Sequence, residues 1–292
     1  MRPGNADRRF TRDFGLILTM TQGDRETQLR ETQDAFDSVA ADYDGPRGNN
    51  SLIQDMRHEM WRWLDRTFAP GSRLIDLGCG TGLDAVRMAK LGHRITATDW
   101  SPQMIARTAD RARRESVTEQ VEAMAVGAHE LHHLEGRGRF DGAYSNLGPL
   151  NCVPDLSDVS TACARLLKPG GALVFTVIGR VCPWEIVHYA LRWRWPRLKM
   201  RFARNVVPAS MNKHTIWTRY YAPREFYRAF ERDFALEHYR GLCVFAPPPY
   251  LTGVRERHAR AYESLWRIDR RAAGWPLLRS IGDHFLIVMT KR

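Results

Sequence analysis

Residues 74–82 read Leu74-Ile75-Asp76-Leu77-Gly78-Cys79-Gly80-Thr81-Gly82, a short apolar run followed by a turn rich in glycine. The apolar run predicts a buried β-strand, and the pattern over residues 83–91 predicts that a helix follows the turn. Because glycine has no Cβ, the backbone of such a turn can pass close to a ligand. The first N–H groups of the helix are free to bind a carboxylate. The segment therefore predicts a small-molecule site between a strand and a helix.

This turn differs from the glycine fingerprint of the dinucleotide-binding proteins. The third glycine of that fingerprint would stand where Leu83 is, whereas the last glycine here is Gly82. Asp76, near the end of the strand, would repel the two charges of a pyrophosphate. It would attract a ligand that carries an ammonium and a sulfonium group. The turn therefore favours a cationic ligand over a nicotinamide cofactor.

A second acid follows the next predicted strand. Asp99 stands at the distance from the glycine turn expected of an acid that accepts both hydroxyls of a ribose. Trp100, beside it, can cover one face of an adenine. An isolated acid at a strand end can also cap a helix, but Ser101 and Pro102 already form the expected start of the next helix. The glycine turn upstream favours the ribose role.

Strands and helices alternate through the middle of the chain, which predicts a parallel sheet with helices on both faces. The expected strands cover residues 73–77, 94–98, 121–126, 141–145 and 172–178, and two more cover 234–239 and 285–290. The expected helices cover residues 31–39, 52–68 with Ser51 as cap, 83–91, a segment that starts at 102, 156–167 and 256–270. Residues 1–30 are polar and aperiodic, and we expect them to form a flexible tail.

Three motifs together resemble the class I S-adenosylmethionine-dependent methyltransferases. They are the glycine turn at 76–82, the acid Asp99 after the second strand, and Leu-Leu-Lys-Pro-Gly-Gly at 166–171 before the fifth strand. The resemblance covers residues 36–178 and the two C-terminal strands. It implies an α/β, Rossmann-like, seven-stranded and mostly parallel sheet whose last strand is antiparallel, with helices on both faces. It also implies that S-adenosyl-L-methionine lies over the C-terminal edge of the strands.

The resemblance assigns cofactor contacts residue by residue. Asp76, Gly78, Cys79, Gly80 and Gly82 would flank the methionine part of the cofactor, and Asp99 and Trp100 would hold its ribose and adenine. Tyr43 resembles the aromatic residue that closes over the cofactor in this family, and Asn146 would help to position the cofactor.

The loop after the third strand departs from the family pattern. The family usually carries Gly-Asp-Ala there, and its Asp binds the adenine amino group, whereas this chain reads Gly127-Ala128-His129-Glu130. Ala128 would still offer its backbone N–H to adenine. The acidic contact to adenine is missing unless His129 or Glu130 replaces it.

Two features bear on a nucleic-acid substrate. The net charge of +11 would attract nucleic acid, although an arginine-rich surface has the same charge without that function. Enzymes that methylate nucleic-acid bases carry Asn or Asp followed by Pro-Pro and an aromatic residue after the fourth strand. Here Leu147 and Gly148 follow Asn146. The sequence therefore does not favour nucleic acid as a partner.

Residues 179–232 form an expected cap inserted after the fifth strand, with no clear strand pattern, and residues 240–283 form a second insertion. The cap is rich in aromatic residues and arginine. Three interpretations stay open: a lid over an apolar substrate with arginines steering an anionic group, a segment in peripheral contact with a membrane, and simple packing onto the domain. The candidate substrate contacts are Asn151, Trp184, His188, Tyr220 and Tyr221.

A methyl-transfer enzyme needs a general base only for some acceptors. The candidates for such a group are His129, His284 and Glu185. The five cysteines have no metal-ligand spacing, so we expect no metal site and reduced thiols in the cytoplasm. Arg8-Arg9 before residues 14–18 faintly resemble a twin-arginine export signal, but the apolar run is short. Met20 is an alternative start to Met1.

We therefore predict an enzyme that transfers a methyl group to an oxygen or nitrogen of a small, lipophilic or aromatic molecule, in specialised or lipid metabolism. Three alternatives stay open. They are an RNA or DNA methyltransferase, a catalytically silent regulatory subunit that binds the cofactor, and use of the cofactor for another reaction such as cyclisation. The protein is expected in the cytoplasm, as a monomer or a homodimer.

Overall fold

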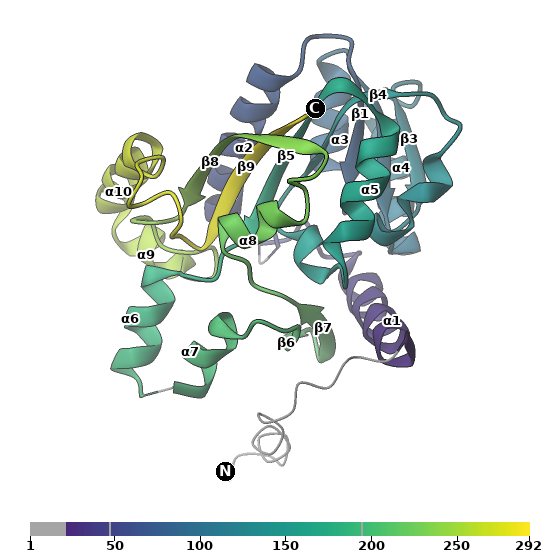
Figure 1. Cartoon of the computed structure of the whole chain (residues 1–292). Helices are drawn as coiled ribbons and strands as arrows, with labels where there is room; N and C mark the ends of the chain where they lie inside the picture. The colour runs from purple at the N-terminus through teal and green to yellow at the C-terminus, as the bar shows by residue number, and fades with distance from the viewer. Residues whose placement is uncertain (1–21, 47, 194) are drawn as a thin grey trace.

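The computed structural model describes residues 22–46, 48–193 and 195–292. One seven-stranded sheet runs through the molecule in the order β3-β2-β1-β4-β5-β9-β8 (Figure 1). Its strands are β1 (Arg73–Leu77), β2 (Arg94–Asp99), β3 (Val121–Ala125), β4 (Phe140–Ser145), β5 (Leu167–Ile178), β8 (Phe234–Leu242) and β9 (His284–Lys291). The first five pair in parallel, and β9 runs antiparallel to both of its neighbours. The predicted Rossmann-like sheet is therefore confirmed.

Helices cover both faces of this sheet because its strands alternate apolar side chains between two cores. On β5, Phe175 packs with α5 (Leu156–Leu166) and α8 (Pro223–Arg228), whereas its neighbour Val174 packs on the opposite face. That face is covered by α2 (Ser51–Thr67), α3 (Leu83–Lys90) and α4 (Pro102–Arg114). Buried parallel strands need such cover on both sides.

Several element ends differ from the prediction by a few residues. Asn50, not Ser51, caps α2, because the Asn50 Oδ1 accepts hydrogen bonds from the N–H groups of Leu52 and Ile53 at 3.0 and 3.1 Å. β5 begins at Leu167, five residues before the predicted start at 172, and so includes the Lys-Pro-Gly-Gly motif. The Ser101 cap of α4 is confirmed, since its Oγ accepts from the Met104 N–H at 3.0 Å.

The N-terminal helix is longer than predicted. α1 spans Gln22–Val39, so residues 22–30 are helical and the expectation of a flexible tail is wrong for them. Its C-terminal half packs on a distant strand, a contact that local sequence cannot reveal. The candidate export signal (Arg8, Arg9 and residues 14–18) and the alternative start Met20 lie outside the described residues.

The chain between β5 and β8 contains two unlike parts (Figure 1). α6 (Pro183–Leu191) and α7 (Trp195–Phe202) come first. A hairpin of β6 (Val207–Met211) and β7 (His214–Thr218) follows, so the prediction of no strand in this segment is wrong. Asn212 and Lys213 turn the hairpin with positive φ angles of 46° and 69°, as a tight two-residue turn requires.

The second insertion, between β8 and β9, is also helical. It holds α9 (Thr252–Arg257) and α10 (Ala259–Ala272), so the helix predicted over 256–270 is present over 259–270, while the break before it and the additional helix α9 were not predicted. The backbone leaves the helical region at His258, which separates the two helices. Within the described residues, no helix is long and apolar enough to cross a membrane.

Candidate functional site

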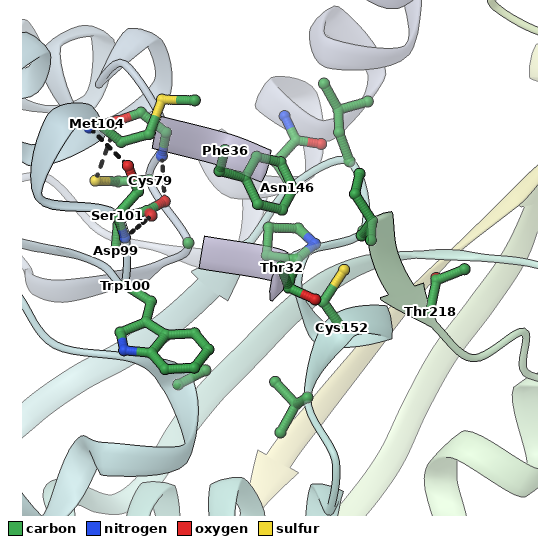
Figure 2. A pocket seen from close by; sticks show the side chains of 18 of the residues that line it. Thr32, Phe36, Cys79, Asp99, Trp100, Ser101, Met104, Asn146, Cys152 and Thr218 are labelled. Carbon is green, nitrogen blue, oxygen red and sulfur yellow. Dashed lines mark hydrogen bonds between the residues drawn. The ribbon is translucent and has the colours of Figure 1, made fainter. Parts of the chain in front are cut away.

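A cavity of about 340 Å³ lies at the carboxyl ends of the parallel strands (Figure 2). Its walls come from the loops after β1, β2, β3 and β4, from α1 and α2, and from the β6–β7 hairpin. Its lining includes Leu29, Thr32, Gln33, Phe36, Tyr43, Arg57, Gly78, Cys79, Gly80, Thr81, Asp84, Asp99, Trp100, Ser101, Met104, Ala128, His129, Asn146, Leu147, Pro149, Cys152, Val153, Ile178, Ala209, Met211, Ile216, Thr218 and Tyr220. Crevices at this edge are where open α/β sheets bind ligands.

The glycine turn forms the floor of one end. The N–H groups of Gly78 and Cys79 both donate to the Thr98 carbonyl, at 2.8 and 2.9 Å, and so pin the turn to β2. A Cβ on Gly82 would lie 2.8 Å from the Thr108 side chain of α4, so this glycine serves helix packing and does not line the cavity. Gly80 does line it, at a φ of +55°.

Asp99 connects the end of β2 to the glycine turn. One carboxylate oxygen accepts from the Gly80 N–H and the other from the Ser101 N–H, each at 2.9 Å. Burial raises the pKa of Asp99 to about 6. Because Ser101 caps α4, the alternative interpretation of Asp99 as the cap of that helix is not needed.

The loop after α1 closes over the same turn. Tyr43 lies above Gly80, since a Cβ on that glycine would be 3.7 Å from the Tyr43 ring. The next residue, Asp44, accepts a hydrogen bond from the Thr81 hydroxyl at 2.7 Å and pairs with Arg111. These contacts hold the Tyr43 loop against the turn.

Trp100 and His129 meet edge to face at the end of the cavity beside β2, with ring centroids 4.6 Å apart. Burial lowers the pKa of His129, so the imidazole is neutral near pH 7. The Glu130 carboxylate instead accepts from the Gly127 N–H at 3.1 Å and is not part of the cavity wall. Of the two residues that could replace the family's acid, His129 reaches the cavity.

Asn146 is held in a buried polar network that sequence reasoning missed. Its Nδ2 donates to Asp84 at 3.0 Å and its Oδ1 accepts from Thr176 at 2.9 Å. Asp84 also pairs with Arg57, which is 8% exposed and whose Nε has no hydrogen-bond partner in the part of the chain that the structure describes. The available signal was an arginine in the middle of the apolar face of a helix.

Asp76 lies on β1 beneath the cavity and does not line it. The side chain is buried, and its Oδ2 has no hydrogen-bond partner within residues 22–46, 48–193 and 195–292. Burial, with the nearby charge of Asp84, holds the pKa of Asp76 well above its usual range. A cation bound at the glycine turn would stabilise the ionised form of the Asp76 carboxyl group.

Of the five candidate substrate contacts, Tyr220 alone lines the cavity. Asn151 binds the backbone of Ile178 and Arg219 through both ends of its amide, so it joins β5 to the hairpin segment. Trp184 donates to the Phe245 carbonyl at 2.9 Å, His188 contacts Arg192 on the surface of α6, and Tyr221 is buried in the core.

The structure separates the three candidate catalytic groups. His129 lines the cavity, whereas His284 and Glu185 do not. His284 contacts Asp283 at 2.8 Å, and Glu185 pairs with Arg201 at 2.5 Å. Because Arg201 also pairs with Asp283, this cluster connects α6 and α7 to the start of β9.

The described arginine side chains of the cap do not reach the cavity either. Arg180 and Arg219 both pair with Glu225. No arginine among residues 179–193 and 199–232 lines the cavity, so steering of an anionic group by these residues finds no support here. The described residues contain no cluster of His, Cys, Asp or Glu that could hold a metal. The five cysteines are free.

Comparisons with known proteins agree with this geometry. A family model described as "Methyltransferase domain" matches residues 74–171. The ubiquinone biosynthesis O-methyltransferase of Xanthomonas campestris pv. campestris (strain B100) is 32% identical over 167 residues, which are 55% of this chain and 67% of that protein.

Two solved structures share the fold. A SAM-dependent methyltransferase from Methanosarcina mazei superposes with a TM-score of 0.54 at 17% identity, covering 78% of this chain and 96% of that one. A geranyl diphosphate C-methyltransferase from Streptomyces coelicolor A3(2), solved with S-adenosyl-L-homocysteine, gives 0.52 at 16% identity, with 81% and 76% covered. The chain therefore belongs to the class I S-adenosylmethionine-dependent methyltransferases and is an enzyme whose cofactor is S-adenosyl-L-methionine.

Proposed function

We propose that this enzyme transfers the methyl group to an oxygen or nitrogen of a small, lipophilic or aromatic molecule. The supporting observation is that one cavity joins two unlike halves. The half beside the glycine turn carries glycine backbone, Asp99 and the Arg57–Asp84 pair. The half under α1 and the hairpin is lined mostly by apolar side chains, among them Leu29, Phe36, Ile178, Met211 and Ile216.

The residues beside the turn fit the cofactor. Asp99 would accept the two ribose hydroxyls, and Trp100, Met104, Ala128 and His129 would surround the adenine. Gly80 leaves room for close approach, since a Cβ there would project toward Tyr43 across the cavity. We assign the methionine carboxylate to Arg57, whose Nε lacks a partner among the described residues. Asp76 and Asp84 would balance the positive charge of the ammonium group on the methionine part of the cofactor.

When bound, the cofactor supplies an electrophilic methyl group on a sulfonium that leaves as a neutral thioether. The chain then has two tasks, to align the acceptor atom with that methyl group and to exclude water. Alignment of this kind can lower a barrier by about 7–11 kcal/mol. Phe36, Met211 and Ile216 would exclude water on the acceptor side. We assign His129 to adenine contact rather than proton transfer, because it stands beside Trp100.

The apolar acceptor half favours this reading over the nucleic-acid alternative. Phosphate contacts need lysine or arginine side chains, and the described lining of that half has none. The name of the matched ubiquinone biosynthesis O-methyltransferase also agrees with a lipophilic acceptor.

The test combines binding and turnover. Calorimetry with S-adenosylmethionine and with S-adenosylhomocysteine should give micromolar affinities, and labelled methyl should pass to members of a panel of phenols, catechols and amines. No binding to either by folded protein would contradict the assignment of the cavity. Binding without transfer to any acceptor would support the silent-subunit alternative, and transfer to RNA or DNA with a steep salt dependence would support the nucleic-acid one.

Peripheral contact with an anionic membrane is a separate part of this proposal. Large apolar side chains are exposed on α6, on α7 and between the two helices, and these are Val187, Leu191 (77%), Trp193 (79%) and Phe202. The same segment of the chain carries Arg192 and Lys199. Basic residues beside exposed aromatics suit a surface of anionic lipid. Flotation with phosphatidylglycerol vesicles should recover wild type but not Leu191→Glu, and neither should float with phosphatidylcholine alone. Equal flotation of both proteins would contradict this contact.

The predicted division of the chain stays a proposal. It places one methyltransferase domain over 31–292, with insertions at 179–232 and 240–283. Its support is that β8 and β9 complete the sheet on which both insertions stand. Cytoplasmic localisation and the choice between monomer and homodimer also stay predictions, which cell fractionation and analytical ultracentrifugation would test.

A further inference from the structure

The two halves of the cavity differ in charge. Figure 2 shows Asp99, Ser101 and Met104 on one side of the cavity and Cys152 and Thr218 on the other. The acidic and arginine side chains of the lining are Arg57, Asp84 and Asp99, and all three lie beside the glycine turn or the end of β2. Among the described residues, the lining from α1, η3 (Pro149–Cys152) and the hairpin carries no charged side chain.

Thr218 is the unusual polar group of the uncharged half. It is the last residue of β7 and shares the cavity face of that strand with Ile216, two positions earlier. The side chain is 5% exposed, and apart from a weak contact with the Cys152 thiol its Oγ1 has no hydrogen-bond partner within the described residues. The buried Thr98 hydroxyl, by contrast, donates to the Asp76 carbonyl at 3.0 Å. A buried hydroxyl without a strong protein partner needs an explanation, and a bound water or ligand at the cavity would supply one.

The neighbours of Thr218 are also neutral. The Cys152 thiol lies close enough for the Thr218 hydroxyl to lower its pKa, yet burial still raises the pKa of Cys152 to about 12. Burial likewise raises the pKa of Tyr220 to about 12. Both groups are therefore protonated near pH 7. An ionised acceptor group placed here would lose its hydration without gaining a counter-charge, which is strongly unfavourable.

Building on the proposed function, we propose that the methyl acceptor is an uncharged molecule with an apolar body, and that Thr218 binds its hydroxyl or carbonyl group. In this arrangement Thr218 Oγ1 gains the strong hydrogen bond that it lacks, while Phe36, Met211 and Ile216 contact the apolar body. Thr218 is thus a residue that determines acceptor specificity. Carboxylate and phosphate compounds of the same shape are excluded by desolvation.

The test uses two probes of similar shape, neutral 4-hexylcatechol and anionic 4-hexylbenzoate, titrated into full-length protein saturated with S-adenosylhomocysteine. Wild type should bind the catechol at least about tenfold more tightly than the benzoate. Thr218→Val should weaken catechol binding by about two- to tenfold, the effect of one hydrogen bond. Thr218→Ser should restore it. Thr215→Val, on the same strand but outside the cavity lining, is the matched control and should bind as wild type does.

Affinity for S-adenosylhomocysteine separates this proposal from the one on which it rests. We expect it to be unchanged in all three variants. If wild type binds S-adenosylhomocysteine but Thr218→Val binds the catechol normally, or if the benzoate binds as well as the catechol or neither probe binds, the acceptor inference is overturned alone. If wild type binds no S-adenosylhomocysteine, the proposed function fails first and the inference fails with it.

Discussion

The half of the cavity beside the glycine turn and the half under α1 are built in different ways. In the first, the glycine turn and Asp99 come from short segments at the ends of β1 and β2, and backbone hydrogen bonds from Gly78 and Cys79 to Thr98 fix the turn. The second is assembled from distant segments: the Trp217 N–H donates to the Thr32 hydroxyl at 3.1 Å across 185 residues. The half proposed to bind the donor therefore depends more on local motifs, and the half proposed to bind the acceptor depends more on tertiary packing.

The largest expected effect is a loss of cofactor affinity when the half of the cavity beside the glycine turn is changed. Asp99→Ala removes both acceptors proposed for the ribose and leaves the Gly80 and Ser101 N–H groups without their partner. Hydrogen bonds to a charged group contribute about 1.5–3 kcal/mol each, so affinity for S-adenosylmethionine should fall by about 10²- to 10⁴-fold. Calorimetry measures this. The control Asp65→Ala changes only a surface ion pair with Arg87, and near-wild-type affinity of Asp99→Ala would refute the ribose assignment.

A smaller loss of cofactor affinity is expected when a larger side chain at Gly80 fills part of the half beside the glycine turn. Gly80→Val adds bulk beneath Tyr43 and should weaken cofactor binding by about 10- to 100-fold, the cost of overpacking a tight site. Gly92→Val is the control, since Gly92 has a similarly positive φ of +89° but open space around it. It should lose stability and keep affinity. An equal loss of affinity in both variants would mean that backbone strain, and not cofactor space, causes the effect.

The pH dependence of cofactor binding tests the half of the cavity beside the glycine turn without a substitution. The pKa of Asp99 is raised to about 6, and the ionised carboxylate is the form that accepts two ribose hydrogen bonds. Affinity should therefore be full above pH 7 and decrease as pH falls through 6, by about tenfold at pH 5. In Asp99→Asn the affinity should be weaker and this dependence absent. A wild-type affinity that stays flat from pH 8 to pH 5 would contradict the assignment.

The smallest effect is expected where the second half is assembled. Trp217→Phe removes the indole N–H that donates to Glu31 at 2.6 Å and so loosens α1 on the hairpin. The KM for an active phenol or catechol should rise by about two- to fivefold, as for one exposed hydrogen bond, while cofactor affinity stays constant. Trp275→Phe changes an exposed tryptophan elsewhere and serves as control. If cofactor affinity falls as much as acceptor affinity, the two halves are not independent.

The amino-acid sequence alone determined the fold class, and the glycine turn and Asp99 of the proposed donor half. Apolar runs that alternate with helical patterns predicted the strands and helices of the sheet. The glycine turn and Asp99 each follow a strand, and they meet at one edge because the carboxyl ends of parallel strands lie together. Tertiary structure decided which polar residues reach the cavity. Arg57 and Thr218 gave no local motif, whereas His284 and Glu185 looked catalytic but join Asp283 and Arg201 away from the cavity.

The β6–β7 hairpin and α1 show the same limit. Neither the hairpin nor the first turns of α1 have a strong local pattern, and α1 packs on the hairpin through Glu31 and Thr32, far from the hairpin in sequence. Local propensity contributes a few tenths of a kcal/mol per residue, which tertiary contacts readily override. Motifs report interactions between residues near in sequence, so they describe the donor site well. The acceptor site consists of contacts between distant segments, which exist only once the chain has folded.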